Sequence, residues 1–271
     1  MNQLHNTRTN QSDMKRTKNN NKQAFTLHEL LVVAIVVLGM ALLAVQSMAQ
    51  VAKKSPRIYC ANNLKQISTA FRVWAGSHTD RYPQKVSTAS GGAMINGASV
   101  LPGNTYTVFQ VMSNELVTPK TMVCPSDGER NATTNFLNQT GKGAFNNLTV
   151  SYWVGRDADQ TMSQMLLSGD RNVYGNSATV ASPSAVILAS YGNSPVTPSL
   201  AGALIAIGTN ANSTLNPPPV GFTDKMHRQA GNVAMADGSV QQFTSLRFYS
   251  ARAQAGDTTA YAPGQNTILF P

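Results

Sequence analysis

Apolar residues form one long run near the start of the chain. From Leu30 to Met48, nineteen positions include only two polar residues, Gln46 and Ser47. About 20 apolar residues cross the hydrocarbon core of a bilayer as a helix, so this run predicts a transmembrane helix. Five basic residues and one acidic residue precede it in residues 1–24. That bias predicts a cytoplasmic leader, with the remainder of the chain outside.

A second apolar pattern follows, with helical spacing. Apolar residues recur at intervals of 4, 3, 4 and 3 at Cys60, Leu64, Ile67, Phe71 and Trp74. This spacing places them on one face of a helix and predicts a buried stripe. We therefore expect one helix over residues 25–76, with residues 25–49 in the membrane and 50–76 outside it.

The remaining residues, 77–271, change to short apolar runs between turn-rich segments. This pattern predicts an α+β protein in which the long helix packs on a small antiparallel sheet with long loops. The hairpin prediction is the strongest, because two alternating runs in residues 231–243 flank Asp237-Gly238. The other expected segments are strands at 149–154 and 164–168, a short helix or strand pair within 105–117, a tight turn at 169–172, and loops at 77–104 and 175–220.

The charge distribution bears on the class of partner. The formal net charge is +9 at pH 7, but residues 1–24 carry +4 of it and no basic block follows. A basic leader before an apolar run is a topology signal, so nucleic acid is not an expected partner. Only 12% of the residues are charged, which suits an extracytoplasmic, loop-rich domain.

Two processing schemes are compatible with the N-terminal region. Cleavage after the apolar run, at Ser47-Met48-Ala49, would release a secreted protein. The alternative is cleavage before the run. Residues 24–35, AFTLHELLVVAI, resemble the signal of type IV prepilins and type II secretion pseudopilins. The resemblance implies cleavage between Ala24 and Phe25, N-methylation of Phe25, and Glu29 at the fifth mature position. Ala24 and His28 depart from the usual glycine and apolar residue.

The resemblance to prepilins explains a carboxylate at the head of an apolar run. Cleavage before Phe25 creates an α-amino group, and Glu29 of one subunit can neutralise the amine of its neighbour. A paired charge is tolerated in a low-dielectric bundle, whereas an unpaired one is costly. The implied protein is a filament subunit with a pilin-like fold, held by a single pass in the inner membrane with its C-terminal domain periplasmic or extracellular. Its implied partners are pilin or pseudopilin subunits, a prepilin peptidase and an inner-membrane assembly platform.

The chain has two cysteines, Cys60 and Cys124. The predicted topology places both on the oxidising side, which permits a disulfide between the helix and the sheet region. Two buried free thiols are the alternative.

His227 begins the C-terminal motif H-x9-D-G, which ends at Asp237-Gly238. This motif, with CANNLKQI at residues 60–67 and Cys124-Pro125, resembles prepilin-like proteins of Planctomycetes and Verrucomicrobia. Asp237-Gly238 can serve as a two-residue hairpin turn, or His227 can be held by Asp237 or Asp170. In a metal-binding version, with calcium as the preferred ion, Asp224 or Asp127 would add oxygen ligands.

No catalytic motif with a nucleophile, base and orienting group is present, so an enzyme is not expected. The leading interpretation is a subunit of a type II secretion pseudopilus or type IV pilus-like filament. The main alternative is a membrane-anchored binding module that displays loops 85–104 and 175–220. An anchored hydrolase that uses His227 ranks below both.

Overall fold

The computed structural model describes residues 26–95, 100, 102–137, 143–178, 181–195, 202–209, 214–255 and 266–271, and of residues 42–55 only the backbone. The chain divides into two compact units, Met1–Gln50 and Val51–Pro271. We call the second unit the head.

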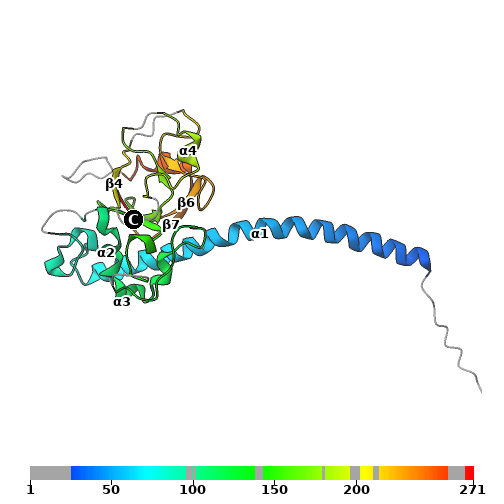
Figure 1. Cartoon of the computed structure of the whole chain (residues 1–271), viewed down its shortest axis with the longest axis horizontal. Helices are drawn as coiled ribbons and strands as arrows, with labels where there is room; N and C mark the ends of the chain where they lie inside the picture. The colour runs from blue at the N-terminus through cyan, green and yellow to red at the C-terminus, as the bar shows by residue number, and fades with distance from the viewer. Residues whose placement is uncertain are drawn as a thin grey trace, which may run out of the picture. The chain divides into compact units, whose positions relative to one another are not determined.

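The described part of the chain combines one long helix with short helices and strands (Figure 1). The α-helices are α1 Leu27–Gly76, α2 Thr105–Gln110, α3 Ser113–Leu116, α4 Ala185–Leu188 and α5 Ser245–Ala251. The strands are β1 Tyr152–Gly155, β2 Leu166–Asp170, β3 Val173–Tyr174, β4 Ala203–Ala206, β5 Gly221–Phe222, β6 Ala230–Met235, β7 Val240–Thr244 and β8 Thr267–Phe270. The described ranges also contain 3₁₀ helices at Pro83–Lys85, Thr88–Ser90, Pro102–Asn104, Pro119–Met122 and Asn147–Thr149.

Helix α1 corrects the membrane assignment of its first half. It runs for 50 residues with Pro56 inside it, but the described part of the chain contains no helix that is both long and apolar enough to cross a membrane. The predicted transmembrane part, residues 25–49, is therefore contradicted.

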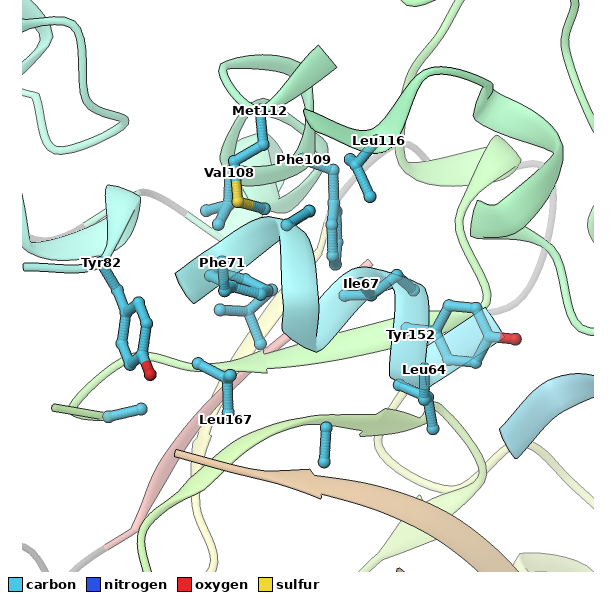
Figure 2. Close-up of a cluster of buried hydrophobic side chains, with 14 of the residues drawn as sticks. Leu64, Ile67, Phe71, Tyr82, Val108, Phe109, Met112, Leu116, Tyr152 and Leu167 are labelled. Atoms are coloured by element: carbon cyan, nitrogen blue, oxygen red, sulfur yellow. The ribbon is translucent and has the colours of Figure 1, made fainter. Parts of the chain in front are cut away.

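The predicted apolar stripe of α1 forms the centre of the head's larger core. All five stripe residues are buried. Figure 2 shows the helical segment that carries Leu64, Ile67 and Phe71 between α2 and α3 on one side and strands of the sheet on the other. The Phe71 ring meets Phe109 of α2 edge-on, with 6.2 Å between ring centroids. The 3.5-residue spacing of the stripe thus keeps one face of α1 buried along its passage through the head.

The main sheet has six strands in the order β4-β8-β1-β2-β6-β7. All of its strand pairs are antiparallel, so the α+β class with an antiparallel sheet is confirmed. Side chains alternate between the two faces of a sheet along each strand. Here the side chains of the two faces belong to two different hydrophobic cores, so both faces are covered. On β1, Tyr152 and Val154 belong to the core around α1, whereas Trp153 belongs to a second core with Phe222 and Phe248.

Several element boundaries differ from the predictions. Residues 105–117 form two short helices, which is the helical one of the two predicted alternatives, whereas β2 extends through Asp170, so the predicted turn at 169–172 starts inside a strand. The described residues of the segment 175–220 include α4 and β4, where the sequence predicts mostly surface loop. Strand β8 lies between β4 and β1. These differences arise where pairing with a distant strand, rather than local composition, determines the structure.

Candidate functional site

The head contains a buried group of side chains that we call the histidine–disulfide cluster: Cys60, Cys124, His227 and Asp170. Each comes from a different segment. Cys60 lies on α1, Cys124 follows the 3₁₀ helix Pro119–Met122, Asp170 ends β2, and His227 lies in the loop between β5 and β6. The helix, the sheet and two loops therefore meet at this cluster.

Cys60 and Cys124 form a disulfide, as the sequence predicts. Both residues are fully buried. The bond joins residues 64 positions apart, and closing a loop of this length stabilises a fold by roughly 4 kcal/mol in the chain-entropy model. It ties the start of the head's helical segment to the loop that precedes β1.

His227 lies against both the disulfide and a carboxylate. Its Nε2 atom is 3.4 Å from Cys124 Sγ and 3.3 Å from Asp170 Oδ2. The two alternatives for the partner of His227 are thus resolved in favour of Asp170. The backbone carbonyl of His227 accepts a hydrogen bond from the guanidinium of Arg57 on α1.

The backbone around His227 is strained. Met226, Arg228 and Gln229 have φ angles of 61°, 55° and 56°, in the left-handed region that side-chain-bearing residues seldom adopt. Backbone hydrogen bonds from Gln229 N to Thr223 O, and from His227 N to Lys225 O, hold the loop in this conformation. Such strain persists only where surrounding contacts impose it. Here the strained loop conformation places the imidazole of His227 against the disulfide.

Asp170 is fully buried and only partly satisfied. Its Oδ2 atom accepts hydrogen bonds from the backbone and side-chain nitrogens of Asn232, at 2.6 and 2.9 Å. Its Oδ1 atom has no hydrogen-bond partner within the described residues. Burial raises the pKa of Asp170 to about 7, although the Asn232 hydrogen bonds oppose that shift.

Burial acts on His227 in the opposite direction. It lowers the pKa of His227 to about 4, and the positive charge of Arg57 adds to that shift. Between these two pKa values the carboxyl of Asp170 carries a proton and the imidazole is neutral. Over the mildly acidic range the contact between the two side chains is therefore one between neutral groups and not an ion pair.

The other end of the H-x9-D-G motif lies at the β6–β7 turn and contacts α1. Asp237 Oδ1 accepts a hydrogen bond from Ser239 N at 2.8 Å, which is turn chemistry. The carbonyl of Gly238 accepts from Ser68 Oγ at 3.0 Å, and the carbonyl of Asp237 accepts from Arg72 at 3.2 Å. The motif thus fastens β6 to α1 at both of its ends, through Arg57 at one end and through Ser68 and Arg72 at the other.

The turn itself differs from the predicted two-residue type. Gly238 N bonds to Met235 O at 2.9 Å, and Met235 N bonds to Ser239 O at 2.8 Å. Gly238 has a φ of 89°, whereas Asp237 is absent from the positive-φ residues of the described chain. The connection is therefore a three-residue loop that ends in a left-handed glycine.

Asp224 and Asp127, the carboxylates proposed as additional calcium ligands, do not form a common site with His227. Asp224 accepts a hydrogen bond from Gln229, and Asp127 forms an ion pair with Arg171. Within the described ranges, the one group of three acidic, histidine or cysteine residues close enough to share an ion is Cys60, Cys124 and His227. Calcium takes six to eight oxygen ligands, and this arrangement does not supply them.

The sequence analysis did not predict a buried network of charged residues next to the histidine–disulfide cluster. Arg171 is fully buried and donates to both carboxylate oxygens of Asp127, at 2.7 and 3.0 Å. It also donates to Glu129 at 2.9 Å and stacks on Tyr191 at 3.6 Å. Burial alone would raise the pKa of Asp127, but the Arg171 contacts bring it below its ordinary value. An Asp and an Arg 44 positions apart give no local signal of such a pair.

At the start of α1, Glu29 has a local role that the sequence analysis did not identify. Thr26 N and Thr26 Oγ1 both donate to Glu29 Oε2 at 2.9 Å, and Glu29 N donates to Thr26 Oγ1 at 3.3 Å. This reciprocal arrangement is a capping box at a helix N-terminus. The hydrogen bonds lower the pKa of Glu29, so the side chain is ionised at neutral pH. Ala24 and Phe25, the predicted cleavage site, lie outside the described residues.

Searches with family models, among curated proteins and among solved structures found no match to this chain.

Proposed function

We propose that this chain is a prepilin-like subunit that polymerises through the N-terminal part of α1 into a type II secretion pseudopilus or type IV pilus-like filament. The observation that carries the proposal is the exposed apolar surface at the start of that helix. Ten large apolar side chains between Leu27 and Met40 are 47–85% exposed. They point in every direction around the helix, so packing against several neighbours is needed to cover them.

Burial of this surface in a helical bundle supplies the assembly energy. Each large aliphatic side chain contributes about 1.5–3 kcal/mol when it is transferred fully from water to an apolar environment. The neighbours that provide such an environment are identical or similar subunits, whose corresponding segments have the same composition. A prepilin peptidase and an inner-membrane assembly platform are the partners that the N-terminal motif implies.

Glu29 sets the register in this proposal. Its carboxylate is exposed and ionised in the single subunit, where Thr26 is its partner. In the filament it neutralises the N-terminal amine of a neighbour that begins at Phe25. A carboxylate in an apolar bundle is tolerated only with such a partner, so a mis-staggered neighbour is disfavoured.

Within the head, α1 is joined to the other segments by a disulfide and by hydrogen bonds. The disulfide joins α1 to the loop before β1, and both ends of the H-x9-D-G motif contact α1. A disulfide is typical of oxidising compartments, which supports a periplasmic or extracellular head.

Two substitutions separate the register role of Glu29 from its capping role. Glu29→Gln retains a side chain that serves in a capping box but removes the charge that pairs with an amine. Thr26→Val removes the cap and retains the charge. We expect Glu29→Gln to abolish filaments in the native cell, as seen by electron microscopy and by subunit cross-linking, and Thr26→Val to form them.

The control is Asp80→Asn, which removes a negative charge at an exposed position of the head. It should assemble like the parent protein. If Glu29→Gln assembles normally, or if Thr26→Val fails in the same way, the charge is not the determinant and the proposal is wrong. Mass spectrometry of the filament protein should in addition find N-methylated Phe25 as its first residue.

A further inference from the structure

We infer that the head contains a zinc site that is available only when the disulfide is reduced, with Cys60, Cys124, His227 and Asp170 as ligands. In this state the two thiolates, the imidazole and the carboxylate form a four-coordinate set. The inference concerns the head alone and does not depend on filament formation.

Two of the ligand pairs, both involving His227, already have the separation that a tetrahedral ion requires. Zinc bonds of about 2.3 Å to sulfur and about 2.0–2.2 Å to nitrogen and oxygen give ligand–ligand distances of about 3.3–3.8 Å. His227 Nε2 lies 3.4 Å from Cys124 Sγ and 3.3 Å from Asp170 Oδ2. The candidate atoms of Cys60, Cys124 and His227 all lie within 4.8 Å of one another. Ligation therefore needs the sulfur–sulfur bond to open and the carboxylate of Asp170, which lies outside that group of three, to move toward the cysteines.

The site is enclosed, and its fourth ligand has spare acceptor capacity. All four residues are buried, so bulk water does not compete as a ligand. The unpartnered Oδ1 atom of Asp170 is a buried acceptor with no donor in the described part of the chain. Asn232 holds the other oxygen, and such hydrogen bonds orient a ligating carboxylate.

The donor set selects the ion. Thiolate with imidazole and carboxylate suits zinc, whereas calcium and magnesium require oxygen ligands.

The disulfide-bonded state and the zinc-bound state exclude each other, because each sulfur is either in the disulfide or bound to the metal. A thiol or phosphine reductant supplies two electrons and breaks the S–S bond, and two protons convert the sulfurs to thiols. Zinc binding then releases the thiol protons, and a disulfide oxidant reverses the sequence and expels the ion.

The consequence is a second way to hold the same three segments together. Both the disulfide and the zinc ion would join α1 to the loop before β1, and the ion would add the β2 end and the β5–β6 loop. A reduced chain in the presence of zinc could therefore keep the native arrangement of the head before oxidation.

Cobalt(II) titration of the full-length chain, reduced with a phosphine, tests the inference. We expect one cobalt per chain, with the visible bands of a tetrahedral ion and a near-ultraviolet thiolate charge-transfer band, both removed by one equivalent of zinc. The oxidised protein should show neither band. His227→Gln should weaken cobalt binding by about tenfold or more, whereas His78→Gln, a histidine that stacks on Trp74 outside the cluster, should bind as the parent does.

Near-ultraviolet circular dichroism of each variant establishes whether it is folded. Should His227→Gln fail to fold, alkylation of the reduced parent protein supplies the second measurement, and zinc should protect both cysteines. The inference is overturned if the folded, reduced protein gives no charge-transfer band, if zinc gives no protection, or if a folded His227→Gln variant binds cobalt as tightly as the parent.

Discussion

The Nε2 atom of His227 lies 3.3 Å from the Oδ2 atom of Asp170, and both side chains are buried. Neither residue is near the other in sequence, and the shifts in their pKa values are opposite. Burial raises the pKa of Asp170 from 3.8 to about 7 and lowers that of His227 from 6.5 to about 4. Folding therefore transfers one proton from the histidine to the aspartate between about pH 4 and pH 6.5.

This transfer predicts that His227 and Asp170 together contribute no pH dependence to the stability of the oxidised protein. The stabilisation linked to Asp170 is present below pH 3.8 and is lost as the pH rises to about 7. The stabilisation linked to His227 is present above pH 6.5 and is lost as the pH falls to about 4. The two residues change the free energy of unfolding with pH in opposite directions. The two changes cancel because the folded and unfolded chains bind the same number of protons at these two sites.

Substitution of either residue alone should reveal the pH dependence of stability that the other residue contributes. Relative to the parent protein, Asp170→Asn should lose stability as the pH falls from about 6.5 to about 4, because only the histidine term remains. His227→Gln should lose stability as the pH rises from about 4 to about 7. Urea unfolding of the oxidised proteins across this range measures both. Slopes of the same sign in the two variants would contradict the proton transfer.

Gly238 should be required for two separable reasons. Its φ is 89°, and a Cβ there would lie 2.9 Å from Arg72 Cδ. Gly143 has a similar φ of 93°, but no atom of the described residues lies within 4 Å of a Cβ there. We expect Gly143→Ala to cost about 1 kcal/mol through backbone strain alone, and Gly238→Ala to cost about 2 kcal/mol or more.

Adding Arg72→Ala to Gly238→Ala should recover part of the difference, because it removes the atom that a Cβ meets. The free energy of unfolding in urea is the measurement. Equal losses for Gly143→Ala and Gly238→Ala would show that contact with α1 does not constrain the turn.

Removal of Arg171 should leave a buried carboxylate without its main partner. We expect Arg171→Met to lower the free energy of unfolding at neutral pH by roughly 3–5 kcal/mol, because Asp127 stays buried and charged. Without Arg171, burial raises the pKa of Asp127 above its ordinary value of 3.8, so the loss should shrink as the pH falls toward 3.8 and protonation of Asp127 removes the uncompensated charge.

Lys85→Met is the matched control for the Arg171 substitution. It breaks an ion pair with Asp159 that is partly exposed and 3.4 Å long, and such pairs contribute less than about 1 kcal/mol. If the two substitutions cost the same, burial does not make the Arg171 pair important.

Local patterns were sufficient for the elements that carry a strong period. The stripe from Cys60 to Trp74 identified the buried face of α1, because a helix repeats its face every three to four residues. The alternation around Asp237-Gly238 identified the β6–β7 hairpin, but not its three-residue loop, since the loop type depends on how the turn meets Arg72 and Ser68. The membrane assignment relied on the apolar composition of residues 30–48, the basic leader and the resemblance to prepilins, and the described helix does not support it.

The chain by itself determined the class of the fold, the buried face of α1, the hairpin and the pairing of its two cysteines. Those features follow from periodicity and from the small number of available partners. Only the tertiary structure decided that His227 meets Asp170 instead of Asp237, that Arg171 pairs with Asp127, and that the motif fastens β6 to α1. Each of these contacts joins segments distant in sequence, and their meeting depends on how α1 and the sheet pack.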